Sequence, residues 1–184
     1  MFDVIETLAS LTAAGSYDPF ADVAVSALRA ECKGTVTDDQ VGTAMAGFAE
    51  CAPQPDAAPA LQAAVDAGMR VFTLSNAATA TTRAFLARAG LDSHVEQVLS
   101  IDDVQAWKPA PAVYAWAIER AGVPPDDVAL VAVHSWDVHG AHAAGMTTGW
   151  CPRLETVPTQ VFAPPDVEGA TLTDIVRLLA DLPG

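Results

Sequence analysis

The chain has 184 residues, of which 51% are hydrophobic, and its formal net charge is -14 at pH 7. This length and hydrophobicity predict one folded domain with room for a small insertion, and they exclude a disordered chain. The acidic charge and the lack of a basic run argue against nucleic acid as a partner. No apolar stretch of transmembrane length and no leader peptide is found, so we expect no membrane association and a cytoplasmic location.

Short apolar runs alternate with helical patterns along most of the chain. Strands are predicted where such runs are short and rich in β-branched residues, over residues 1–4, 70–74, 95–101, 128–133 and 146–151. Helices are predicted where apolar residues recur at helical spacing, over residues 19–31, 37–48, 60–67, 79–89, 112–121, 138–144 and 172–182. Residues 8–17 are expected as a linker and residues 158–169 as a loop. This alternation predicts an α/β fold with a parallel sheet between layers of helices.

The helices predicted over residues 19–31 and 37–48 are all that separates the first strand from the rest of the sheet. We therefore expect residues 11–51 to form a small, reduced helical cap. Residues 1–10 and 52–184 then form the α/β core.

Polar side chains follow four of the predicted strands. Asp3 follows the first apolar pair of the chain, and Ser75-Asn76 follows the apolar run over residues 70–74. Asp137 follows the buried run over residues 128–133. Lys108 lies just before the helix predicted over residues 112–121, and a proline is present for the first turn of that helix. In open α/β sheets ligands bind at the carboxyl ends of the strands, where side chains from separate strands converge. Taken alone, Asp137 is better explained as a helix cap, but the ordered set indicates an active site.

Other reactive residue types have simpler explanations. The three cysteines, at positions 32, 51 and 151, have neither a disulfide nor a zinc spacing, so we expect reduced, structural thiols. His139 and His142 share a helix face, but with so few carboxylate neighbours we expect no metal site and no cofactor. Trp136 is expected in the core, and Tyr114 either packs its helix or lines the pocket.

The ordered motifs resemble those of the haloacid dehalogenase superfamily, and within it the type II L-2-haloacid dehalogenase-like branch. The resemblance covers the chain from Asp3 to about Trp150 and implies a Rossmann-like core. Its four motifs are Asp3-Val4-Ile5-Glu6-Thr7, Ser75-Asn76, Lys108-Pro109-Ala110-Pro111-Ala112-Val113-Tyr114 and His134-Ser135-Trp136-Asp137.

The resemblance implies a role for each motif. Asp3 is the nucleophile that attacks the carbon bearing the halogen, and water then hydrolyses the resulting ester. Lys108 keeps that carboxylate ionised, while Asp137 positions Lys108 and helps to orient the water. The implied binding residues, which hold the substrate, its pocket or the nucleophile's loop, are Thr7, Ser75, Asn76, Tyr114 and His134.

Two departures bear on the chemistry. Ile5 stands where phosphatases of this superfamily carry a second aspartate, and an alkyl side chain cannot transfer a proton. The cap is shorter than in the branch, and no arginine precedes Arg29 to receive the departing halide, which costs on the order of a few kcal/mol of electrostatic help.

The sequence therefore favours a bacterial hydrolase of the 2-haloacid dehalogenase type that acts on a small 2-substituted carboxylate. The alternative is a catalytically weak or inactive protein that keeps the fold as an interaction or dimerisation module. A small-molecule phosphatase is the third choice. A homodimer is among the expected assemblies.

Overall fold

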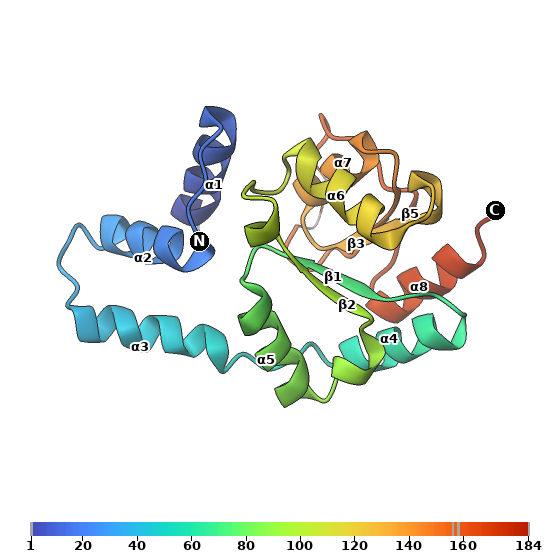
Figure 1. Cartoon of the computed structure of the whole chain (residues 1–184), viewed down its shortest axis with the longest axis horizontal. Coiled ribbons are helices and arrows are strands. Elements are labelled where there is room, and N and C mark those ends of the chain that lie inside the picture. Colours follow the sequence, from blue (N-terminus) through green and yellow to red (C-terminus); the bar gives the residue numbers. More distant parts are fainter. Residues whose placement is uncertain (1, 156, 158, 184) are drawn as a thin grey trace.

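The computed structural model describes residues 2–155, 157 and 159–183, and the side chains of residues 2 and 3 lie outside that description. It is an α/β structure in which parallel strands lie among helices, as the sequence predicts (Figure 1). Three N-terminal helices lie to one side of the strands, and the remaining helices surround them (Figure 1).

The chain begins with a helix where the sequence predicts a strand. Helix α1 spans Phe2–Ala14, so the predicted strand is wrong over residues 2–4 and the predicted linker is wrong over residues 8–14, while residues 15–17 lie outside any helix or strand and Met1 lies outside the described residues. A strand needs a neighbour for its backbone groups, whereas a helix satisfies them within its own segment. The leucine and alanine residues of this segment also favour a helix. The helix runs without a break across the expected domain boundary between residues 10 and 11.

The next two helices confirm their predictions. Helix α2 spans Phe20–Glu31 and helix α3 spans Asp38–Ala49. The Thr37 side chain accepts a hydrogen bond from the backbone of Gln40, whose side chain accepts one from the backbone of Thr37 in return. This reciprocal cap satisfies two backbone donors at the start of α3 and fixes where the helix begins.

The strands form two parallel sheets rather than the single sheet expected. Strand β1 pairs with β2, and strand β4 lies between β3 and β5. Their bounds are Phe72–Ser75 for β1, Gln97–Ser100 for β2, Ala129–Ala132 for β3, Thr147–Trp150 for β4 and Val167–Glu168 for β5. Within the described residues no strand pairing joins β1 to β3, so side chains and helices connect the two sheets.

The remaining helices lie close to their predicted positions. They are α4 (Ala57–Asp66), α5 (Thr79–Ala89), α6 (Pro111–Ala121), α7 (Ser135–Ala143) and α8 (Leu172–Ala180), with short 3-10 turns η1 (Asp92–His94), η2 (Ile101–Asp103) and η3 (Pro125–Asp127). Helix α7 packs against β3 and β4, and α4 packs against α8. Gly90 and Gly122 end α5 and α6 in the left-handed conformation, which a residue with a Cβ adopts only at a cost.

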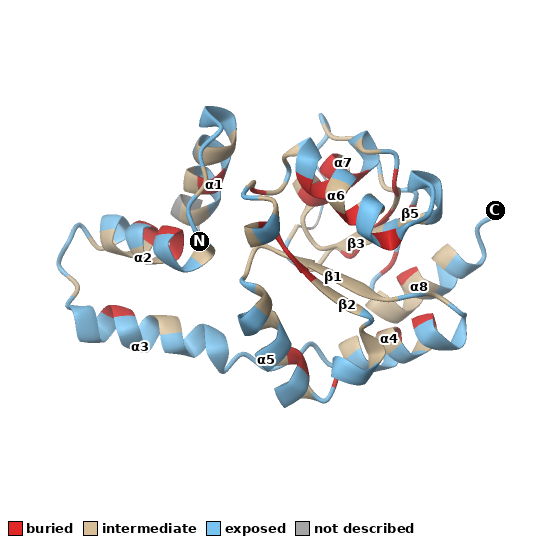
Figure 2. Ribbon diagram, in the orientation of Figure 1, coloured by how far each residue is buried: buried red, intermediate tan, exposed pale blue. Residues whose placement is uncertain are grey.

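Burial is concentrated around the strands and helices α6 and α7, whereas α1 to α3 are mostly exposed (Figure 2). Trp107 is fully buried and packs with Leu8 of α1 and Val23 of α2, so this tryptophan attaches the N-terminal helices to the rest of the molecule. Among the helices described, none has the length and apolar character needed to cross a bilayer.

Candidate active site

A buried ion pair lies at the carboxyl ends of β1 and β3. Lys108 Nζ is 2.7 Å from Asp137 Oδ2 and donates a second hydrogen bond of 3.1 Å to the carbonyl oxygen of Leu74 in β1. The side chains of Lys108 and Asp137 are 10% and 7% exposed. Asp137 stands in the first turn of α7, where the helix N-terminus favours a negative charge. The structure therefore brings two of the three predicted catalytic residues together.

The two oxygens of Asp137 are both occupied. Tyr114 Oη donates a hydrogen bond of 2.7 Å to Oδ1, while Lys108 holds Oδ2. Burial of the phenol and the adjacent Asp137 charge raise the pKa of Tyr114 far above its ordinary value, so it stays a neutral donor. The N-cap position of α7 belongs to His134, so Asp137 acts as a partner of Lys108 rather than as the helix cap.

Gly140 makes room for this arrangement. A Cβ placed on Gly140 would lie 2.6 Å from Tyr114 Oη, far inside van der Waals contact. Only glycine at this point of α7 lets the Tyr114 ring cross the helix and reach Asp137. Tyr114 thus packs its helix and orients Asp137 at the same time, while its place in the lining of a substrate pocket stays a prediction.

The second motif forms a tight turn after β1. Ser75 Oγ accepts a hydrogen bond of 2.9 Å from the backbone of Ala77, and the Ser100 hydroxyl donates one of 2.9 Å to the carbonyl of Ala77. Asn76 Oδ1 is buried and has no hydrogen-bond partner among the described residues. Buried polar atoms are nearly always paired, so this acceptor is open to a donor that the described residues do not supply.

The first motif lies on α1 instead of at a strand end. Asp3 is in the first turn of that helix, and its side chain lies outside the described part of the chain. Thr7 lies one turn further and is partly buried. Val4 and Leu8 of the same helix pack in the cluster that contains Trp107, the residue directly before Lys108. The first motif therefore lies beside the segment that carries Lys108, although in an unexpected conformation.

His134 stands between β3 and α7 with a carboxylate beside it. Its Nδ1 is 3.3 Å from Glu155 Oε1, and its ring stacks on that of Trp136 with centroids 5.2 Å apart. The backbone N–H of Ser135 donates to Glu155 Oε2 at 3.1 Å. Burial alone would raise the pKa of Glu155, but the hydrogen bonds from Ser135 and His134 outweigh it, so that pKa lies below its ordinary value.

Two features of this region differ from expectation. Trp136 is only partly buried and stacks on His134, so its prediction as a core residue is wrong; Trp150 and Trp107 fill the core instead. Glu155 was missed. It is the first acidic residue after β4, which runs parallel to β3, so its place after a neighbouring strand was the available signal.

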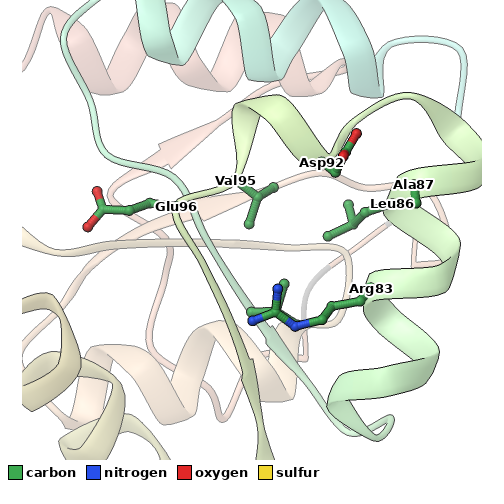
Figure 3. Close-up of a pocket in the computed structure, with 7 residues that line it drawn as sticks. Arg83, Leu86, Ala87, Asp92, Val95 and Glu96 are labelled. Atoms are coloured by element: carbon green, nitrogen blue, oxygen red, sulfur yellow. The ribbon is translucent and has the colours of Figure 1, made fainter.

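A separate pocket lies at the opposite ends of the strands. It is lined by residues of α5, η1 and the start of β2, namely Arg83, Leu86, Ala87, Asp92, Val95, Glu96 and Val98 (Figure 3). Lys108 meets β1 at its carboxyl end, so this pocket is remote from the ion pair and is not the candidate active site. Among the described residues, no three or more His, Cys, Asp or Glu side chains gather in a way that would hold a metal ion.

Comparison with known proteins identifies a family for this chain. The family model for haloacid dehalogenase-like hydrolases matches residues 3–145. Haloacetate dehalogenase H-2 of Moraxella sp. (strain B) is 30% identical over 169 residues, which are 90% of this chain and 75% of that protein. (S)-2-haloacid dehalogenase 4A of Burkholderia cepacia is 35% identical over 136 residues, which are 74% of this chain but only 59% of the relative.

Solved structures show the same likeness. The L-2-haloacid dehalogenase RSc1362 superposes with a TM-score of 0.89 at 31% identity, covering 96% of this chain and 81% of that one. The L-2-haloacid dehalogenase of Xanthobacter autotrophicus with chloropropionic acid covalently bound also gives a TM-score of 0.89, over 98% of this chain and 84% of that one, and at 24% identity it supports the fold alone. With a family model that spans most of its length and a relative matched over three quarters of that relative's sequence, the chain belongs to the haloacid dehalogenase-like hydrolases.

Proposed function

We propose that this chain hydrolyses a small 2-haloacid, or a closely related 2-substituted carboxylate, through an ester formed on Asp3. The observation that carries the proposal is the buried Lys108, held by Asp137 where β1 and β3 end. The names of the similar proteins, which are haloacetate and (S)-2-haloacid dehalogenases, support this substrate class.

In the first step the Asp3 carboxylate attacks the carbon that bears the halogen. A carbon–oxygen bond forms while the carbon–halogen bond breaks, and the halide leaves with the bonding electron pair. Two acceptors for the Lys108 ammonium lie in the described residues, which leaves its third N–H for an anionic group of the substrate or nucleophile. In a site with little solvent such a cation attracts an anion more strongly than it does in water.

Ser75, Asn76 and Thr7 complete the binding site in this proposal. Ser75 and Asn76 hold the substrate carboxylate, with the Ser75 hydroxyl and the Asn76 amide N–H groups as donors. Thr7 orients the first motif. Because Ile5, two residues after Asp3, cannot donate a proton to a leaving alcohol, substitution at carbon is favoured over phosphoryl transfer.

The test is halide release from L-2-chloropropionate by the purified protein and by Asp3→Asn. Glu6→Gln is the matched control, since Glu6 is an exposed acid on the same helix. We expect release by the wild type and the control and none by Asp3→Asn. Release that persists in Asp3→Asn would show that another carboxylate is the nucleophile.

A second candidate function is favoured by one observation. The first motif lies on α1 rather than at a strand end, which fits a protein that keeps the fold as an interaction module without turnover. Folded wild-type protein that releases no halide from any small 2-haloacid would support it. For either function we expect a homodimer, as the family resemblance implies, and light scattering measures the assembly.

A further inference from the structure

The turn that carries Ser75 and Asn76 is held by several hydrogen bonds. Lys108 Nζ donates to the carbonyl oxygen of Leu74, the residue before the turn, at 3.1 Å. Within the turn, the backbone N–H of Ala77 donates to Ser75 Oγ at 2.9 Å. A serine hydroxyl has one hydrogen to donate and two lone pairs. Ser75 makes no hydrogen bond as a donor within the described residues, so its hydrogen is available for a carboxylate.

Ser100 holds the other side of this turn. It is the last residue of β2, lies directly opposite Ser75 in the β1–β2 pair and is fully buried. Its hydroxyl donates to the carbonyl oxygen of Ala77 at 2.9 Å and accepts from the backbone N–H of Asp102 at 3.1 Å. The second bond caps the 3-10 turn η2, but the first joins segments 23 positions apart. The hydroxyls of Ser75 and Ser100 therefore hold the N–H and the carbonyl of Ala77.

The same network continues to the N-terminal helices. The phenol of Tyr17, between α1 and α2, donates to the Asp102 carboxylate. Burial and this carboxylate raise the pKa of Tyr17 well above its ordinary value, so the phenol remains a donor. The Tyr17 ring lies beside that of Trp107, with the centroids 5.8 Å apart. A continuous network therefore runs from Tyr17 through Asp102 and Ser100 to the turn after β1.

We propose that Ser100 positions the turn of Ser75 and Asn76 for the substrate carboxylate, an inference that rests on the assignment of that carboxylate to this turn in the proposed function. The hydroxyl of Ser100 is committed to two backbone groups, so it acts through the turn. Donors that are already oriented lose little conformational freedom on binding, and this raises their affinity for an anion. Tyr17 supports the same arrangement through Asp102.

The experiment measures KM and kcat for halide release from L-2-chloropropionate by Ser100→Ala and the wild type. The substrate carboxylate keeps its charge throughout the reaction, so a weaker hold on it raises KM and leaves kcat nearly unchanged. We expect KM to rise about tenfold, because the variant leaves the partly buried carbonyl of Ala77 without its donor. Ser100→Cys, which keeps a weaker donor, should recover part of the affinity. Tyr17→Phe should raise KM by less than Ser100→Ala.

Thr148→Val is the matched control. Thr148 is a fully buried residue of β4 whose hydroxyl donates to Asp166 Oδ2 at 2.7 Å and accepts from the backbone N–H of Asp166 at 3.1 Å. Its loss removes a comparable pair of hydrogen bonds from the other sheet, so we expect a wild-type KM. An equal rise of KM in the two variants, an unchanged KM in Ser100→Ala, or a loss confined to kcat would overturn the positioning role.

Calorimetric titration with propionate measures carboxylate binding apart from turnover, because propionate carries no halogen. We expect Ser100→Ala to bind it about tenfold more weakly than the wild type and Thr148→Val to bind it equally well. If Ser100→Ala does not fold, Ser100→Cys decides both measurements. A wild-type protein that releases no halide but binds propionate in this pattern would refute the proposed reaction and support the role of Ser100. A wild-type protein that binds no propionate would overturn that role, whatever its halide release.

Discussion

The ion pair between Lys108 and Asp137 is expected to contribute strongly to stability as well as to the site. Two unit charges 2.7 Å apart attract by about 6 kcal/mol at an effective dielectric constant of 20. Removal of one partner leaves the other charge buried, which costs about 3–5 kcal/mol. We therefore expect Lys108→Met and Asp137→Asn each to lower the free energy of unfolding by that amount. The loss of unfolding free energy in the double variant should be about 2–3 kcal/mol smaller than the sum of the two single losses.

Urea unfolding of the four proteins at constant pH measures these values, and the slopes report whether the denatured state has changed. The exposed pair between Arg70 and Glu96 is a matched control, because its nitrogen and oxygen are also 2.7 Å apart while its side chains are 49% and 43% exposed. Its coupling should be much smaller than that of the buried pair, because solvent screens exposed charges. Additive losses at Lys108 and Asp137, or losses below about 1 kcal/mol each, would refute the reasoning from burial.

Two further predictions concern the surroundings of this pair. Gly140→Ala should destabilise the protein by about 1–3 kcal/mol, because the new Cβ displaces the Tyr114 ring from Asp137; an unchanged midpoint of thermal unfolding would contradict the close approach. The pKa of Glu155 is lower in the folded state than in the unfolded state, so its stabilisation is present above the ordinary value of about 4.3 and is lost as the pH falls through the lower folded value. Unfolding free energies measured from neutral pH into that acidic range should therefore fall less steeply for Glu155→Gln than for the wild type, and parallel curves would show that Glu155 contributes nothing through its charge.

Much of the candidate site was predictable because reactive side chains in parallel α/β folds gather at the carboxyl ends of the strands. Lys108 and Asp137 are predicted from separate segments, and the structure joins them at 2.7 Å. Tyr114 lies in α6, the helix that follows Lys108, and its hydroxyl reaches the same carboxylate. Glu155 also follows the carboxyl end of a strand, but it lies in an irregular segment after β4, and no periodic pattern indicates where its side chain turns.

The sequence by itself determined the helices whose ends carry local signals. Thr37 and Gln40 cap α3, and Gly90 and Gly122 end α5 and α6, because each interaction involves residues within one turn. Such signals do not depend on contacts with distant parts of the chain.

Only the tertiary structure decided the conformation of the first residues and the division of the strands into two sheets. The segment at the start of α1 is apolar enough for a strand, but a strand forms only where a distant neighbour offers its backbone groups. Strand β5 is just two residues long, yet it forms a strand because β4 offers its backbone groups as a partner. Helix ends depend on nearby residues, whereas strand pairing depends on segments far apart in the sequence, and for that reason local patterns predict the first and not the second.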